Sequence, residues 1–173
     1  MSKFILIPTK LEAKYVGTRE NVVVSGMGKK TLHTLQKLLS EHKLEHLVLA
    51  GFAGNLRGEK KTGDILSVTS VTDKKDTITI EPFHPFDKTA SMVTVNKPVF
   101  TRTVKDKLAH YADIVDMEGY YFAKFCSDNK IKFNIVRIIS DNCDIDFTQL
   151  SAQFYVYQRA LVNIVAVIEE QLF

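Results

Sequence analysis

Five apolar runs of strand length constrain the fold of this chain more than any other feature. They lie at residues 4–7, 22–24, 47–50, 65–71 and 133–139. Several of these runs are apolar at consecutive positions and not only at alternating ones, which is typical of strands covered on both faces. We therefore expect them to lie inside a covered central sheet.

Two segments show the spacing of a helix face. Between the second and third runs, Leu32, Leu35, Leu38 and Leu39 recur at helical spacing, so residues 22–50 predict a β-α-β unit. Near the C-terminus the apolar positions of one long helix are Leu150, Phe154, Tyr157, Leu161, Ile164 and Ile168. This alternation predicts an α/β fold, with residues 1–173 forming a single layered domain around a mostly parallel or mixed sheet flanked by helices.

The composition excludes several classes of protein. Apolar residues make up 45% and charged residues 25%, as in ordinary globular domains. The net charge of +3 is too small to predict a nucleic-acid partner. The apolar runs are far shorter than the roughly 20 residues that cross a bilayer, so we expect no membrane partner. Cys126 and Cys143 lack CxxC spacing, which favours reduced thiols in a cytoplasmic protein, and no metal or cofactor is predicted.

Two glycine-containing segments follow predicted strands. They are Ser-Gly-Met-Gly-Lys at 25–29 and Gly-Phe-Ala-Gly-Asn at 51–55. Such segments either let a ligand approach the backbone closely or only satisfy a tight turn. The first lacks the G-x-G-x-x-G register and the second lacks G-K-[ST] after four spacers, so dinucleotide and P-loop sites are not expected.

Acidic residues gather after two later strands. In the segment 114–119 a short strand ends in two acids, Asp116 and Glu118, where Asp116 could cap the next helix and Glu118 could complement its dipole. The following helix is apolar almost all round, so Glu118 should be buried and need a partner. Arg137 lies within an apolar strand and could pair with Glu118 and Glu12.

The segment Ser-Asp-Asn-Cys-Asp at 140–144 follows the strand that holds Arg137. A solvated acidic loop is one reading of this cluster. A calcium loop is not favoured, because the glycine and the final glutamate of an EF-hand are missing.

Together these motifs resemble the nucleoside phosphorylase and nucleosidase superfamily. The similarity is closest to the methylthioadenosine/S-adenosylhomocysteine nucleosidases, with the futalosine hydrolases nearby. It rests on 25–29, 51–56, 63–65, 115–119 and 136–141, in the order of the family and across most of the chain. The resemblance implies a domain that acts on the N-ribosidic bond of a purine nucleoside.

The resemblance also implies roles for particular residues. Asp141 matches the acid that protonates or hydrogen-bonds N7 of the departing purine, with Ser140 beside it. Glu118 matches the carboxylate that binds the ribose hydroxyls, and Met117 matches the residue that packs against the sugar. The remaining substrate-binding and catalytic matches are Arg137, which organises the carboxylates, Gly54 in the second glycine segment, and Glu12, which activates the attacking water.

The implied chemistry fits these residue types. Cleavage of a ribosidic bond passes through an oxocarbenium-like state, so the site needs a carboxylic acid facing the leaving base and a carboxylate facing the water. The two carboxyl groups need environments that separate their pKa values. Glu12, Glu118 and Asp141 at three strand ends could meet this need, with Arg137 limiting their repulsion.

The chain departs from the family pattern in two places. The segment 72–101 is short where relatives build part of the base pocket, and Phe100 is our candidate for stacking on the purine, with Phe83 and Phe86 as substitutes. Phe52 replaces a small or hydroxylated residue near the water site. Either the water is held differently or catalysis is impaired.

Three functions remain open from the sequence. Hydrolysis of a purine nucleoside is favoured over phosphorolysis, because no arginine accompanies the glycine segments. A phosphate-dependent purine nucleoside phosphorylase is the first alternative, and a nucleoside-binding protein without turnover is the second. Val156, Val162 and Val167 lie off the main face of the C-terminal helix, so we also expect a homodimer that covers them.

Overall fold

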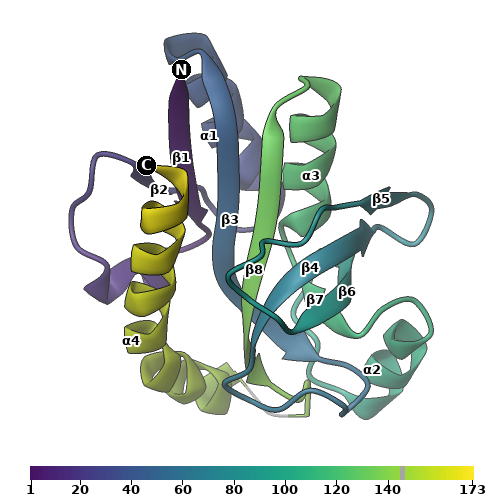
Figure 1. Cartoon of the computed structure of the whole chain (residues 1–173). Coiled ribbons are helices and arrows are strands. Elements are labelled where there is room, and N and C mark those ends of the chain that lie inside the picture. The colour runs from purple at the N-terminus through teal and green to yellow at the C-terminus, as the bar shows by residue number, and fades with distance from the viewer. Residues whose placement is uncertain (145–146) are drawn as a thin grey trace.

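The strands of the protein form one mixed sheet in a computed structural model that describes residues 1–144 and 147–173 (Figure 1). The side chains at 147, 150, 151 and 153 also lie outside the described part, so the predicted apolar position Leu150 is not assessed. The strands are β1 (Ser2–Ile7), β2 (Val22–Val24), β3 (Leu44–Asn55), β4 (Ile65–Thr72), β5 (Thr77–Thr79), β6 (Thr89–Thr94), β7 (Ile114–Asp116) and β8 (Lys132–Asp141). The five apolar runs thus form β1, β2, β3, β4 and β8.

The long strand β3 joins two differently built parts of the sheet. Its first half pairs in parallel with β1, which pairs with β2, and this part is open. Along its length β3 also pairs in parallel with β8, and its last two residues pair antiparallel with β7. Because β8 pairs with β4, β4 with β6 and β6 with β7, these five strands close into a small barrel. The expected mixed α/β sheet is confirmed.

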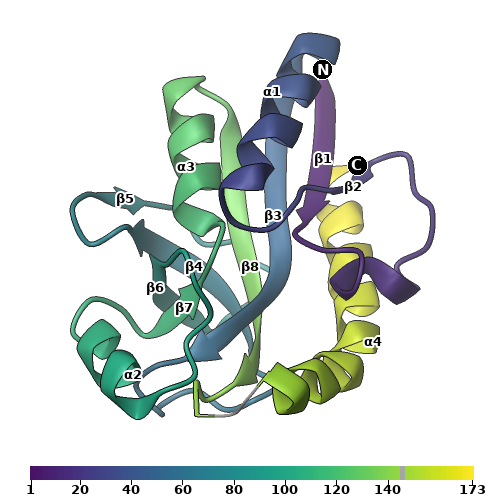
Figure 2. The ribbon, with the colours of Figure 1, turned by 180° about the vertical axis from the view of Figure 1, so that it is seen from behind.

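Helices cover both faces of the sheet. α1 (Thr31–Glu41) and α3 (Gly119–Asp128) lie on one face and α4 (Phe147–Leu172) lies on the other, as the two opposite views show (Figures 1 and 2). The alternation of side chains along β1 produces this layering. Phe4 and Leu6 belong to the core beneath α1 and α3, whereas Ile5 and Ile7 pack with Leu161 and its neighbours on α4.

The middle of the chain differs from its predicted structure in one respect. Three of the four prolines lie within 72–101, a composition that predicts loops and short edge strands, and β5 is such an edge strand. β6, however, is internal, because it pairs with both β4 and β7. The helix α2 (Arg102–Ala109) and the short 3-10 turns η1 (Glu12–Tyr15) and η2 (Gly28–Lys30) complete the described elements.

The second apolar surface of α4 is smaller than the spacing predicts. Val156 is 64% exposed, next to Tyr155 at 60%. Val162 and Val167 are half-buried, and Val162 packs against the core beneath α4. The expected three-valine patch is therefore reduced to its first member.

None of the described helices combines the length and the apolar character needed to cross a membrane.

Candidate active site

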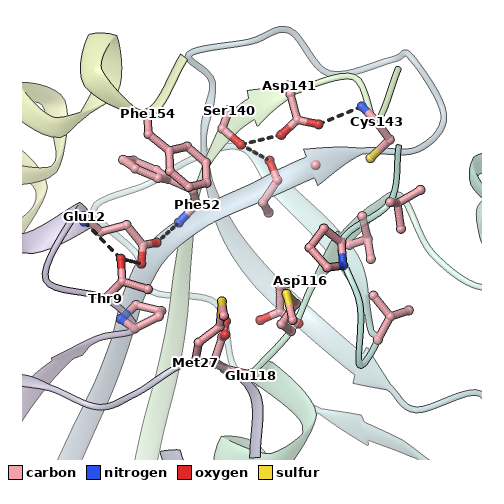
Figure 3. A pocket seen from close by; sticks show the side chains of 18 residues that line it. Thr9, Glu12, Met27, Phe52, Asp116, Glu118, Ser140, Asp141, Cys143 and Phe154 are labelled. Atoms are coloured by element: carbon pink, nitrogen blue, oxygen red, sulfur yellow. Dashed lines mark hydrogen bonds between the residues drawn. The ribbon is translucent and has the colours of Figure 1, made fainter. Parts of the chain in front are cut away.

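A largely apolar cavity lies where β1, β3, β7 and β8 end (Figure 3). Its polar lining comes from six side chains, which are Thr9, Glu12, Asp116, Glu118, Ser140 and Asp141. Figure 3 shows the carboxyl groups of Glu12, Glu118 and Asp141 on three sides of the hollow. The segments that supply them are far apart in the sequence, and the sheet brings them to one edge.

The first carboxyl group, Glu12, is held by its own turn. The hydroxyl of Thr9 donates a hydrogen bond of 2.8 Å to Glu12 Oε2 and accepts one of 3.1 Å from the Glu12 backbone N–H. The backbone N–H of Phe52 donates to Glu12 Oε1 at 3.1 Å. Burial raises the pKa of Glu12, and these hydrogen bonds and the Arg137 charge oppose that rise.

Phe52 supports Glu12 through its backbone and not through its side chain. The ring instead packs on Phe154 of α4, with 4.8 Å between ring centroids, and both rings line the cavity. The unusual side chain at position 52 therefore leaves the hydrogen bond to Glu12 in place and makes this wall of the cavity apolar.

The second group of carboxyls surrounds a fully buried arginine. Arg137 is 0% exposed and pairs closely with Asp116, while Glu118 Oε2 lies 3.8 Å from Arg137 Nη2. Asp116 also accepts hydrogen bonds from the Thr94 hydroxyl at 2.6 Å and from the Gly119 backbone N–H at 2.7 Å. The bond from Gly119 gives the first backbone N–H of α3 a partner, although Glu118, the residue that precedes the helix, makes no side-chain capping bond.

Glu118 is a further carboxyl group whose pKa is raised in the folded protein. Burial, and next the neighbouring Asp116 carboxylate, raise the pKa of Glu118 to about 8, against the attraction of Arg137. The backbone N–H of Gly28 donates to Glu118 Oε1 at 2.8 Å. Glu118 is therefore a carboxyl group that can hold a proton near neutral pH.

Gly51 makes room for the polar side chains behind the cavity. A Cβ atom at this position would lie 2.7 Å from Arg137 Nη1 and 2.9 Å from Glu12 Oε1. Of the two interpretations of this segment, the approach of a ligand and a need of the fold itself, Gly51 fits the second, because it lets two side chains approach. No side chain larger than hydrogen fits there without displacing Arg137 or Glu12.

The third carboxyl group, Asp141, depends on an irregularity in β8. Ala53 is opposite Ile139 but Gly54 is opposite Asp141, so Ser140 is an extra residue in a β-bulge. In a regular strand Ser140 and Asp141 would point to opposite faces, yet both line the cavity. The Ser140 hydroxyl donates to Asp141 Oδ2 at 2.7 Å, and the Cys143 backbone N–H donates to Oδ1 at 2.7 Å. Burial raises the pKa of Asp141, and these bonds oppose the rise.

Most residues predicted for the site meet at this cavity. Its lining includes Glu12, Gly54, Met117, Glu118, Ser140 and Asp141, and Arg137 lies directly behind it. Among the described residues Phe100 does not line the cavity, and neither do Phe83 and Phe86, which pack beneath α4. The neighbouring Val99 lines it instead, so the stacking aromatic predicted at Phe100 is not found there.

Sequence reasoning missed several residues that complete the site. Thr9 stands three residues before Glu12, a T-x-x-E spacing that is itself a signal for such a turn. Asp116 was interpreted only as a helix cap, although it lies two residues before Glu118 and pairs with the same arginine, Arg137. The lining residues Met27, Cys143 and Phe154 carry no local signal that assigns them to this cavity.

The arrangement suits proton transfer within an apolar pocket. Three carboxyl groups with raised pKa values face a space with few polar neighbours. No lysine or arginine is among the described residues that line it. The part of the chain that the structure describes also contains no cluster of three or more His, Cys, Asp or Glu that could hold a metal ion.

Comparisons with known proteins bear on the fold of the chain. The family model described as the phosphorylase superfamily matches residues 88–170, which hold β6 to β8 and most of α4. No curated protein matches the chain.

Solved structures share the fold at low sequence identity. A 5'-methylthioadenosine/S-adenosyl homocysteine nucleosidase from Helicobacter pylori has a TM-score of 0.83 at 17% identity, covering 99% of both chains. A futalosine hydrolase from the same organism has a TM-score of 0.81 at 18% identity, covering 99% of this chain and 98% of that one. A nucleosidase from Chlamydia trachomatis reaches 0.74 at 20% identity over 100% of each chain. The resemblance predicted from the motifs is confirmed.

Proposed function

We propose that this chain, as one domain over residues 1–173, hydrolyses the N-ribosidic bond of a purine nucleoside and releases the free base. The observation that carries the proposal is the set of three buried carboxyl groups with raised pKa values around one apolar cavity. The substrate class is methylthioadenosine, S-adenosylhomocysteine or a related 5'-modified nucleoside, by analogy with the proteins of similar fold.

Each carboxyl group has a separate task in this proposal. Asp141 donates a proton or hydrogen bond to N7 of the leaving purine, and its raised pKa favours the protonated form that this requires. Glu118 binds the ribose hydroxyls beside Met117. Glu12, fixed by Thr9 and the Phe52 backbone, accepts a proton from the attacking water.

The lining supports hydrolysis in preference to phosphorolysis. A phosphate ion needs cationic or multiple N–H donors, and the described lining residues include no lysine or arginine. The Gly28 N–H, at the start of a short helical turn, is already used by Glu118. Water is therefore the nucleophile that we propose.

A panel of purine nucleosides tests the substrate class. Methylthioadenosine, S-adenosylhomocysteine and adenosine are incubated with the protein, and free base is measured by chromatography. We expect release from at least one of them, and much slower release from its 7-deaza analogue, which lacks the N7 atom that Asp141 faces. Equal rates with the analogue would remove Asp141 from this role, and tight binding without release would make the protein a nucleoside-binding protein.

We further propose that the protein is a cytoplasmic homodimer in nucleoside metabolism. Tyr155 and Val156 on α4 are the exposed apolar side chains that association would cover. Specific activity should then fall on dilution through the dissociation range. A monomer by light scattering that is equally active at every concentration would contradict the dimer.

A further inference from the structure

Two side chains that are distant in the sequence bind the residue that follows β8. One comes from β3 and the other from α2. Asn55, the last residue of β3, is 0% exposed, and its Nδ2 donates to Asn142 Oδ1 at 3.0 Å and to the Lys60 carbonyl at 2.6 Å. Lys105 of α2 donates from Nζ to the Asn142 carbonyl at 2.6 Å. Asn142 is therefore held at both its side chain and its backbone, immediately after Asp141.

The residue after Asn142, Cys143, has an unusual backbone conformation. Cys143 has a φ of 59°, in the left-handed region that residues other than glycine seldom adopt. In this conformation its backbone N–H turns back toward Asp141 and donates to Oδ1. Cys143 is 1% exposed, and the missing side chain of Gly54 provides the space that its thiol fills.

We propose that Asn55, Lys105, Asn142 and Cys143, the loop anchor, are positioning residues that aim and polarise the Asp141 carboxyl group from outside the reacting atoms. The inference rests on the proposed function, in which Asp141 is the acid. The bulge at Ser140 turns Asp141 into the cavity, and the loop anchor then supplies the N–H donor that holds Oδ1. Ser140 holds the other oxygen, so both carboxyl oxygens have a donor.

The charged groups near the Asp141 carboxyl group come from its own loop and from α2. Asp144 follows in the same loop and raises the pKa of Asp141, and Lys105 approaches from α2. The Cys143 thiol, whose own pKa is raised by burial, also hydrogen-bonds Asp141. Gly54 of β3 comes close to Asp141 Oδ1 and has no titratable side chain. Loss of the Cys143 N–H bond removes a donor that favours the charged form, so the pKa of Asp141 should rise.

The test compares hydrogen-bonded asparagines near the two ends of the barrel strands. Asn55→Ala and Asn142→Ala each break the loop anchor. Asn134→Ala is the matched control, because Asn134 is also buried and makes two hydrogen bonds of 2.7 Å, to His46 and to the Glu81 carbonyl, near the start of β8. For each variant, kcat, KM and thermal midpoint are measured, and carboxyl NMR titration follows the Asp141 signal, assigned by its loss in Asp141→Asn.

We expect Asn55→Ala and Asn142→Ala to lower kcat about tenfold with KM within about twofold, as when one positioning hydrogen bond is lost. The Asp141 titration should move to higher pH in both. Asn134→Ala should lower the thermal midpoint but leave kcat and the titration unchanged. If Asn55→Ala fails to fold, Asn142→Ala, a half-buried position, decides the question.

Folded anchor variants with the wild-type kcat and titration would overturn the proposal, as would an equal change in Asn134→Ala. Failure of the proposed function would give a different result in the activity assay. The wild type would then release no base, while the titration would still report whether the loop anchor controls Asp141.

Discussion

The two ends of the cavity hold their carboxyl groups by different means. Glu12 is fixed by Thr9, three residues earlier, and by one backbone N–H from β3. Asp141 depends on a bulge in β8 and on a loop fastened by Asn55 and Lys105 from other elements. The cavity thus has one carboxyl group held by a local turn and another held by segments distant in the sequence.

Replacing Arg137, which lies directly behind the cavity, should have the largest effect. Arg137→Met leaves the buried Asp116 and Glu118 without their cation, so the free energy of unfolding should fall by about 3–5 kcal/mol. Urea unfolding measures this change. Lys124→Met, which breaks an exposed pair with Asp128, is the control and should leave the unfolding midpoint nearly unchanged. Similar midpoints for the two variants would contradict the account of Arg137.

Changing the Asp141 end should stop turnover without unfolding the protein. Asp141→Asn keeps the shape of the side chain but removes the proton offered to the leaving base, so kcat should fall at least about 10²-fold. Steady-state kinetics and a circular dichroism melt measure the two properties. A folded variant with nearly normal kcat would show that Asp141 is not the acid.

Removing the hydrogen bond that Thr9 makes to Glu12 should have a smaller effect, and this effect should not reach Asp141. Thr9→Val removes the hydroxyl bonded to Glu12, which should cost about 1–1.5 kcal/mol of stability and lower kcat several-fold. The pKa of Glu12 should rise, because this hydrogen bond favours the charged form. The carboxyl titration of Asp141 should not move. A shift at Asp141 would mean that the two ends are not independent.

The pH dependence of stability should show the shared property of the carboxyl groups. Their pKa values are raised in the folded protein, so the folded state binds more protons than the unfolded state between about pH 4.5 and 8. The free energy of unfolding should therefore fall as pH rises from 5 to 8. Glu118→Gln should reduce this fall by about 3 kcal/mol in urea titrations at the two pH values. A stability that rises over this range would contradict the raised pKa values.

The open part of the sheet was predictable because its signals are local. The apolar runs and the spacing of Leu32 to Leu39 indicate β1, β2, the first half of β3 and α1 without knowledge of distant contacts. The closure of the barrel was not predictable, since it depends on pairings such as β4 with β8 that no local pattern encodes. β6 looked like an edge strand for the same reason.

The site residues likewise fall into those with a local sequence signal and those that depend on tertiary contacts. Glu118, Arg137 and Asp141 stood out because charged residues inside or directly after apolar strands are unusual. The bulge at Ser140 and the contact of Phe154 with Phe52 are tertiary features, so neither could be derived from spacing. Phe100 was placed from a resemblance in a segment whose register one sequence does not fix, and Val99 lines the cavity there.

Product analysis of the wild-type protein tests the central claim most directly. A substrate from the nucleoside panel is turned over in phosphate-free buffer and again with added phosphate, and the sugar product is identified by mass spectrometry. The account predicts free purine and an unphosphorylated sugar at the same rate in both buffers. A sugar 1-phosphate, formed at a rate that rises with phosphate concentration, would contradict hydrolysis.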